Sequence, residues 1–160
     1  MEKIGNIVSV STKGICEIVD IKKDAFVGAV KDKLYYILRP VENANNMLVY
    51  LPVDTSLNIR KLVSKAEAKN IVDGFENAEE VAITSEADRL KTYGEIAKSG
   101  NIADWAKLLR TLKIRKEKLP RKQITSQEQK ILSMVKDCVV SELSIVLGSS
   151  KQDIEDKLAL

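Results

Sequence analysis

The hydrophobic pattern of the chain changes once, near Ser64, and this change limits the possible folds more than any other feature. Before Ser64, short apolar runs rich in β-branched residues are separated by glycine, proline and asparagine. After Ser64, apolar residues recur every three or four positions. The first pattern is typical of strands and the second of helices. The sequence therefore predicts an α+β protein, with a small antiparallel β domain over residues 1–63 and an all-α helical bundle over residues 64–160.

The first block contains several short strand candidates. They cover residues 4–10, 15–21, 34–38 and 47–51. Pro40 and Pro52 stop the last two, because proline cannot donate to a strand ladder. In the second candidate, strict alternation places Ile21 with Ile15 on one face, opposite Cys16 and Ile18. Strands at this spacing within about 60 residues predict a small antiparallel barrel or a strongly curved sheet.

The second block carries signals for helix starts and ends. Ser64 with Glu67, and Thr125 with Glu128, have the spacing of capping boxes. Gly74 is expected to stop the first helix, because glycine often ends a helix. The predicted helices cover residues 64–73, 85–98 with Ser85 as cap, 101–119 before Pro120, 125–147 before Gly148, and a short segment after Ser150.

One helix carries a stripe of large apolar residues that includes the single tryptophan. Trp105, Leu108, Leu109 and Leu112 follow one another at positions i, i+3, i+4 and i+7. Such a stripe faces the core of a bundle. We therefore expect Trp105 to be a core residue rather than a side chain that stacks on or wedges into DNA.

Basic residues cluster in the second block. Residues 107–122 hold eight basic side chains and one acidic residue, Glu117. Residues 1–84 have a net charge of −1, whereas residues 85–160 have +4. A dense basic cluster is typical of contact with a phosphate backbone, but a solvated helix end or a dock for an acidic protein surface has the same composition.

Composition argues against several other classes of function. The chain has no histidine, and its two cysteines, Cys16 and Cys138, lie far apart without the spacing of a metal site. The commonest general base and metal ligand are therefore missing, and we expect no metal and no cofactor. No apolar run reaches the roughly 18 residues that span a bilayer, and the N-terminus has no signal-peptide core. A cytoplasmic, reduced protein is expected.

Several segments together resemble the CarD-like family of bacterial transcription regulators. The matching segments are residues 4–8, 14–18, 35–39, 49–54 and 59–64 in the first block, and residues 98–101, 108–112 with Arg115, 140–143 and 147–148 in the second. The resemblance implies a Tudor-like N-terminal domain that binds the RNA polymerase β subunit. It also implies a helical domain that touches promoter DNA without sequence specificity and modulates open-complex stability. The family has no catalytic activity.

The chain departs from the family pattern at three relevant positions. Many members have a wedge tryptophan at the place that falls near Glu86 here. Two basic residues that face polymerase in the family fall near Asp24 and at Tyr50. The polymerase contact is therefore expected to use different side chains, and the sequence leaves open whether a minor-groove wedge exists without that tryptophan.

These considerations give two sets of candidate site residues. The candidates for DNA contact are Arg89, Lys91, Arg110, Arg115, Lys116, Lys118, Arg121 and Lys122. The candidates for polymerase contact are Lys22, Lys23, Tyr36, Arg39, Val49, Tyr50, Leu51 and Pro52. Two points stay open. Arg110 has either Asp104, Glu117 or a phosphate as its partner, and one ring of the Tyr35–Tyr36 pair either points outward or packs under a loop. The alternative function is a protein-interaction adaptor that does not bind DNA.

Overall fold

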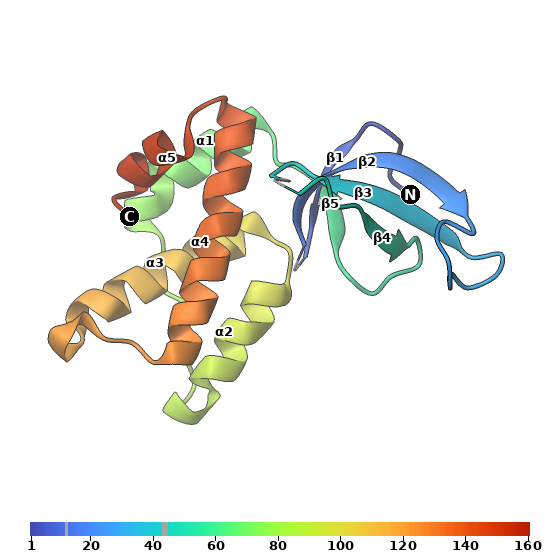
Figure 1. The fold of residues 1–160 in the computed structure, drawn as a ribbon. Helices are drawn as coiled ribbons and strands as arrows, with labels where there is room; N and C mark the ends of the chain where they lie inside the picture. Colours follow the sequence, from blue (N-terminus) through green and yellow to red (C-terminus); the bar gives the residue numbers. More distant parts are fainter. Residues whose placement is uncertain (12, 43–44) are drawn as a thin grey trace. The chain divides into compact units, whose positions relative to one another are not determined.

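The computed structural model describes residues 1–11, 13–42 and 45–160, except for the side chain of Lys122. It contains two compact units, Met1–Leu62 and Val63–Leu160, which we call the sheet unit and the helical unit (Figure 1). Among the described residues, all strands lie in the sheet unit and all α-helices lie in the helical unit. The predicted α+β class is therefore confirmed.

The sheet unit is one antiparallel sheet in the order β4-β3-β2-β1-β5. Its strands are β1 (Ile7–Val10), β2 (Gly14–Lys23), β3 (Leu34–Pro40), β4 (Val49–Pro52) and β5 (Ile59–Lys61). Val8, Cys16, Ile18, Tyr36 and Leu38 belong to its core. Because β4 and β5 stand at the two ends of this order, both are edge strands.

A register shift in β2 corrects the predicted face of Ile21. The pairing of β2 with β3 is irregular between Ile18 and Asp20, so that Val19 is the extra residue. One extra residue moves every later side chain to the other face of the strand. Ile21 therefore packs against the core that contains Cys16 and Ile18, and not on the opposite face, where strict alternation had placed it.

Both rings of the Tyr35–Tyr36 pair are buried, with only 5% and 3% of their surfaces exposed. The Tyr36 ring belongs to the sheet core, and its hydroxyl accepts a hydrogen bond from the Glu2 N–H at 3.0 Å. The Tyr35 hydroxyl accepts one from the Val30 N–H at 3.2 Å, within the connection between β2 and β3. The alternative in which a ring packs under a loop is therefore the correct one, and neither ring points outward.

The helical unit encloses one core. Its elements are α1 (Lys65–Gly74), η1 (Phe75–Asn77), η2 (Glu86–Asp88), α2 (Arg89–Lys98), α3 (Ile102–Lys118), η3 (Pro120–Lys122), α4 (Ser126–Leu147) and α5 (Lys151–Leu158). Trp105 is buried in this core, and its Nε1–H donates to the Ala97 carbonyl at 3.0 Å. The prediction that Trp105 is a core residue is confirmed.

Both predicted capping boxes are present, at Ser64 with Glu67 and at Thr125 with Glu128. Of two other predictions of helix ends, the one at Gly74 is confirmed and the one at Ser85 is wrong. α1 ends at Gly74, although this glycine has a φ of −91° rather than a left-handed conformation and the chain continues directly into η1. Ser85 precedes a short 3₁₀ turn, and its hydroxyl donates to the Asp88 carboxylate at 2.8 Å instead of capping α2.

Candidate nucleic-acid and protein interfaces

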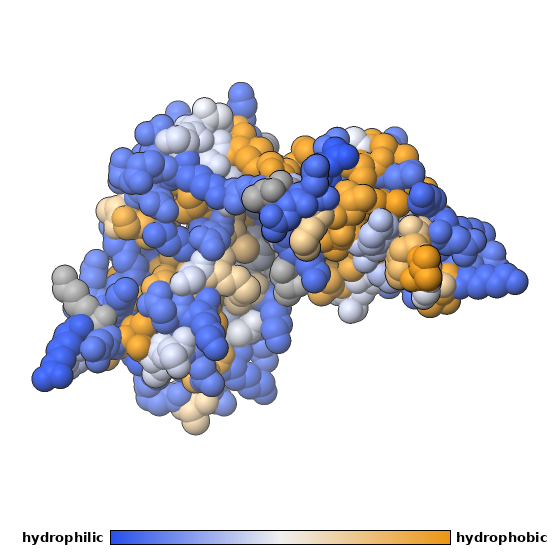
Figure 2. Space-filling model, viewed as in Figure 1, coloured by the Kyte–Doolittle hydropathy of each residue, from blue (hydrophilic) through white to orange (hydrophobic). Residues whose placement is uncertain are grey.

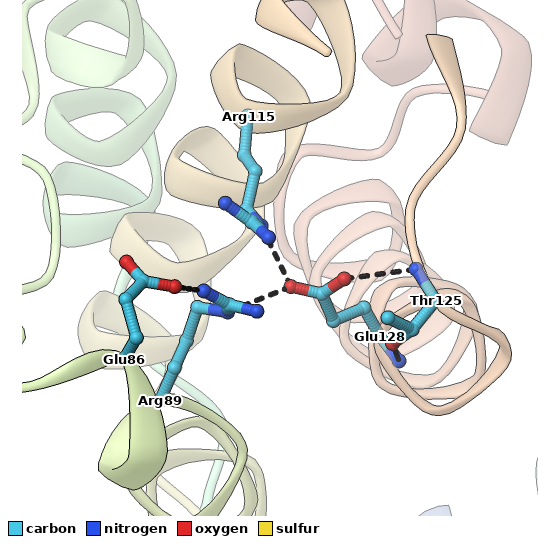
Figure 3. A network of polar contacts seen from close by, with 5 residues as sticks. All are labelled: Glu86, Arg89, Arg115, Thr125 and Glu128. Carbon is cyan, nitrogen blue, oxygen red and sulfur yellow. Dashed lines mark hydrogen bonds and ion pairs between the residues drawn. The ribbon is translucent and has the colours of Figure 1, made fainter. Parts of the chain in front are cut away.

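Two arginines of the DNA-contact set meet at one buried carboxylate, that of Glu128 at the start of α4 (Figure 3). Arg89 Nε lies 3.1 Å and Arg115 Nε 2.7 Å from Glu128 Oε1. The other oxygen, Oε2, accepts from the Thr125 N–H at 2.9 Å. Since Arg89 comes from α2 and Arg115 from α3, Glu128 joins three helices through one side chain.

The contacts of Glu128 favour its charged form. Burial raises the pKa of this carboxyl, but the Thr125 backbone N–H and the Arg115 guanidinium lower it by more, so that the pKa lies below its ordinary value. The carboxylate is therefore negative at neutral pH. It balances one of the two positive charges that Arg89 and Arg115 bring to this point.

A second acidic residue, Glu76, forms ion pairs with two other residues of the basic cluster, Arg110 and Lys113. Arg110 Nη1 lies 3.3 Å from Glu76 Oε2, and Arg110 Nη2 donates to the Glu76 carbonyl at 2.7 Å. Lys113 Nζ lies 3.4 Å from Glu76 Oε1 and also donates to the Leu158 carbonyl. Arg110 therefore has an acidic partner, but this partner is Glu76 rather than Asp104 or Glu117.

The remaining candidates for DNA contact keep their charges available. Among the residues that the structure describes, Lys91, Lys116, Lys118 and Arg121 form no ion pair. Lys91, Lys118 and Arg121 are exposed, and Lys116 is half-buried. The backbone of Lys122 belongs to η3, but its side chain lies outside the described part of the structure.

Lys116 and Lys118 open onto different pockets at the end of α3. Lys118 lines a hollow of about 280 Å³ together with Glu86, Arg89 and Arg115. Lys116 lines another, of about 390 Å³, whose wall includes Lys113 and Lys136. Two residues along a helix correspond to a turn of about 200°, which explains the separation. The cluster is thus divided between two sides of the helix.

In the sheet unit, four of the eight polymerase candidates, residues 49–52, form the edge strand β4, and an edge strand was predicted there. The Val53 N–H donates to the Leu34 carbonyl at 3.0 Å, which makes this pair a hydrogen-bonded one. Hydrogen-bonded and open pairs alternate along antiparallel strands. Tyr36 and Leu51 therefore also form a hydrogen-bonded pair. The main-chain groups of Tyr50 and Pro52 point away from β3, toward the unpaired edge of the sheet. Pro52 offers a carbonyl there but no N–H.

An aromatic cluster lies beside this edge. The Phe26 ring contacts Tyr35 and Tyr50, with centroid distances of 5.2 and 5.1 Å. Phe26 is 40% and Tyr50 37% exposed, so the outer part of the cluster meets solvent. Sequence reasoning missed Phe26. The available signal was an isolated aromatic residue in a charged, glycine-containing connection.

The other polymerase candidates have mixed environments. Lys22 and Lys23 are exposed at the end of β2. Arg39 is exposed and lies 3.7 Å from the Glu17 carboxylate. Leu51 and Tyr36 are buried in the sheet core, so their side chains stabilise the unit and are not presented at its surface.

The described residues contain neither a group of acidic and cysteine side chains placed to hold a metal ion nor a helix able to cross a membrane. Residues 70–159 match the family model "CarD, C-terminal domain". The chain is also similar to the Bacillus subtilis (strain 168) protein named "Putative transcription factor YdeB", at 27% identity over 124 residues. That similarity covers 76% of this chain and 77% of the relative. Because the family match spans more than half of the chain, the protein belongs to the CarD-like family.

Proposed function

We propose that this protein regulates bacterial transcription by binding the β subunit of RNA polymerase through its sheet unit and promoter DNA through its helical unit. The match to the CarD family and the name of the B. subtilis relative support a role related to transcription. The regulator acts by binding and needs no cofactor. Its DNA contact has little sequence specificity and changes the stability of the open complex.

The observation that carries the DNA half of the proposal is the division of the DNA-contact candidates into paired and unpaired residues. Internal carboxylates hold Arg89, Arg110 and Arg115, whereas Lys118 and Arg121 remain exposed without an ion pair among the described residues. Unpaired cations at the end of a helix attract phosphates and release counterions from DNA when they bind. The arginines shape the surface, and the unpaired residues supply its charge.

The side of α3 that carries Lys118 is the better surface for a duplex. Arg89 and Arg115 line the same hollow as Lys118 on this side. The basic neighbours are paired with carboxylates on both sides, but Lys118 is exposed whereas Lys116 is half-buried. We therefore assign the duplex to the Lys118 side and give Lys116 a smaller role.

The polymerase half rests on the open edge and the exposed rings of the sheet unit. An extended segment of the polymerase can pair with the main chain of Tyr50, as in strand addition to other sheet edges. Phe26 and the outer face of Tyr50 would then be covered by the same partner, since exposed aromatic rings are frequent hot spots of binding. Lys22 and Lys23 add positive charge at the end of the neighbouring strand β2.

Joining the two contacts in one chain makes a weak DNA contact effective. Once the sheet unit holds polymerase, nearby promoter DNA is present at an effective concentration of roughly millimolar. A contact with about four phosphates would give a log–log salt slope of about −3.6. Such a contact is too weak to select promoters alone but strong enough to bias an open complex.

The test is the charge reversal of Lys118→Glu with Arg121→Glu in the full-length chain. Loss of two phosphate contacts should lower the salt slope of duplex binding by about 1.8 and abolish the effect on open-complex lifetime. Polymerase binding should be unchanged. Fluorescence anisotropy with a labelled duplex and co-purification with polymerase measure the two properties.

The matched control reverses two exposed lysines of α1, Lys65→Glu with Lys69→Glu, which changes the net charge equally. This control should keep most of the DNA affinity. If both double variants bind DNA as the unchanged protein does, the DNA role is wrong. The adaptor alternative, in which the basic surface docks an acidic protein, would then replace it.

A further inference from the structure

We propose that the hollow between α2 and the end of α3 is a seat for a DNA backbone phosphate, and that the protein's own Glu86 carboxylate occupies it in the free state. The seat is formed by Arg89, Arg115 and Lys118. This inference rests on the proposed DNA contact and adds the site of one phosphate and a side chain that competes for it.

The two ends of the Arg89 guanidinium have different partners (Figure 3). Its Nε edge is fixed by the buried carboxylate of Glu128, which also holds Arg115. Its Nη1 end pairs with Glu86. The Arg89 side chain is only 14% exposed, whereas that of Glu86 is 82% exposed. The arginine is therefore held in place, and the glutamate is the movable member of the pair.

The surroundings of this pair suit an oxyanion. Arg115 and Lys118 line the same hollow of about 280 Å³. With Glu86 in place, three cations face the carboxylates of Glu80, Glu86 and Glu128. When Glu86 turns away, one positive charge is left in excess. A phosphate that enters restores the balance and can accept from the guanidinium groups with good geometry.

The exchange of Glu86 for a phosphate has a small cost. An ion pair with such an exposed carboxylate contributes little to stability, because water solvates the carboxylate almost as well. The seat itself needs no rearrangement, since Glu128 already orients both guanidinium groups. Glu86 thus lowers the affinity for DNA in general without blocking it, and a duplex held near by polymerase displaces it.

The experiment compares Glu86→Gln with Glu79→Gln in the full-length chain. Both variants remove one negative charge from an exposed glutamate, and Glu79 forms no ion pair among the described residues and does not line this hollow. The probe is a labelled 20-base-pair duplex, with anisotropy measured over a range of KCl concentrations. The 20 base pairs are about two turns of DNA.

Glu86→Gln should raise the affinity about fivefold at low salt, because the phosphate then enters the seat without displacing a carboxylate from an exposed ion pair. Glu79→Gln should raise it no more than about twofold. Equal effects of the two variants would overturn the proposal that Glu86 competes with a phosphate for this hollow. The proposed DNA contact would still be tested by the charge reversal of Lys118 and Arg121.

A second measurement separates a DNA phosphate from a free one. Thermal unfolding of Glu86→Gln is followed in inorganic phosphate and in chloride at equal ionic strength. No specific stabilisation by phosphate is expected, because a single small anion lacks the neighbouring contacts that a duplex makes with the surface. Stabilisation by inorganic phosphate without a gain in duplex affinity would assign the seat to a small phosphate and overturn this proposal.

Discussion

The sheet unit and the helical unit treat their apolar side chains differently. Of the twelve large hydrophobic residues that the described chain exposes, eleven lie in the 62-residue sheet unit and one, Ile145, lies in the 98-residue helical unit. In the view of Figure 2, hydrophobic surface correspondingly covers much of the sheet unit, whereas hydrophilic surface dominates the helical unit. The sheet unit exposes part of its apolar surface, whereas the helical unit buries nearly all of its large apolar side chains.

Size explains part of this difference. A domain of about 60 residues buries a smaller share of its surface than one of about 100. Size does not explain why Phe26, Leu34 and Tyr50 are exposed near an open strand edge, where apolar side chains favour binding of another chain. The comparison therefore supports the proposal that the sheet unit binds a protein and the helical unit binds DNA.

The largest effect is expected on the stability of the helical unit when its shared carboxylate is removed. Glu128→Ala removes the carboxylate shared by Arg89 and Arg115 and leaves two partly buried charges together. We expect a loss of about 3 kcal/mol in the free energy of unfolding. Urea unfolding followed by the fluorescence of Trp105, the single tryptophan, reports on this unit alone. Glu117→Ala, an exposed glutamate of α3, should change stability by less than about 0.5 kcal/mol.

The next effect tests the apolar surface of the sheet unit. Phe26→Ala with Tyr50→Ala should weaken polymerase binding about fiftyfold, or about 2.3 kcal/mol, and leave DNA binding unchanged. Surface-immobilised polymerase provides the measurement, and circular dichroism confirms the fold. Ile145→Ala removes the exposed hydrophobic residue of the helical unit and should not change polymerase affinity. Equal losses in both variants would contradict a specific role for the rings.

The smallest effect concerns pH and sharpens the role of Glu128. The pKa of this carboxyl is lower in the folded protein than in the unfolded chain, where it is about 4.3. Its stabilising contribution is therefore complete above that value and is lost as the pH falls through the folded value. Glu128→Gln should be less stable than the unchanged protein at pH 7, and this difference should shrink at pH 3. Thermal melts at both pH values test it, and a constant difference would argue against the charge of Glu128 as its source.

Local signals predicted the architecture well. The boxes at Ser64 and Thr125, the glycine at 148 and the apolar stripe with Trp105 each depend on residues a few positions apart, and the structure confirms them. The strand periodicity predicted the sheet but not the extra residue at Val19, because a bulge depends on the partner strand and not on the sequence of one strand. Ile21 was therefore placed on the wrong face.

The candidate sites could be predicted only in part. The basic cluster is visible in the sequence, but its division depends on pairs that are distant along the chain, Arg89 with Glu128 and Arg110 with Glu76. Glu128 is visible as the second member of a capping box, a role that does not reveal the two arginines. For the same reason, Phe26 becomes a candidate only when its contact with Tyr50 is known.

Pro52, the last residue of β4, also limits the hydrogen bonds that this edge strand can form with another chain. Along the described part of this strand, Tyr50 supplies the outward N–H, and Pro52 contributes an acceptor without a donor. Two copies of the protein that met edge to edge would find few donors to share, so a long intermolecular sheet is disfavoured. The same shortage is tolerable for a short foreign segment that also covers the neighbouring rings. A single imino acid thus limits pairing between copies along β4, whereas the proposed pairing with a segment of the polymerase needs only the donor of Tyr50.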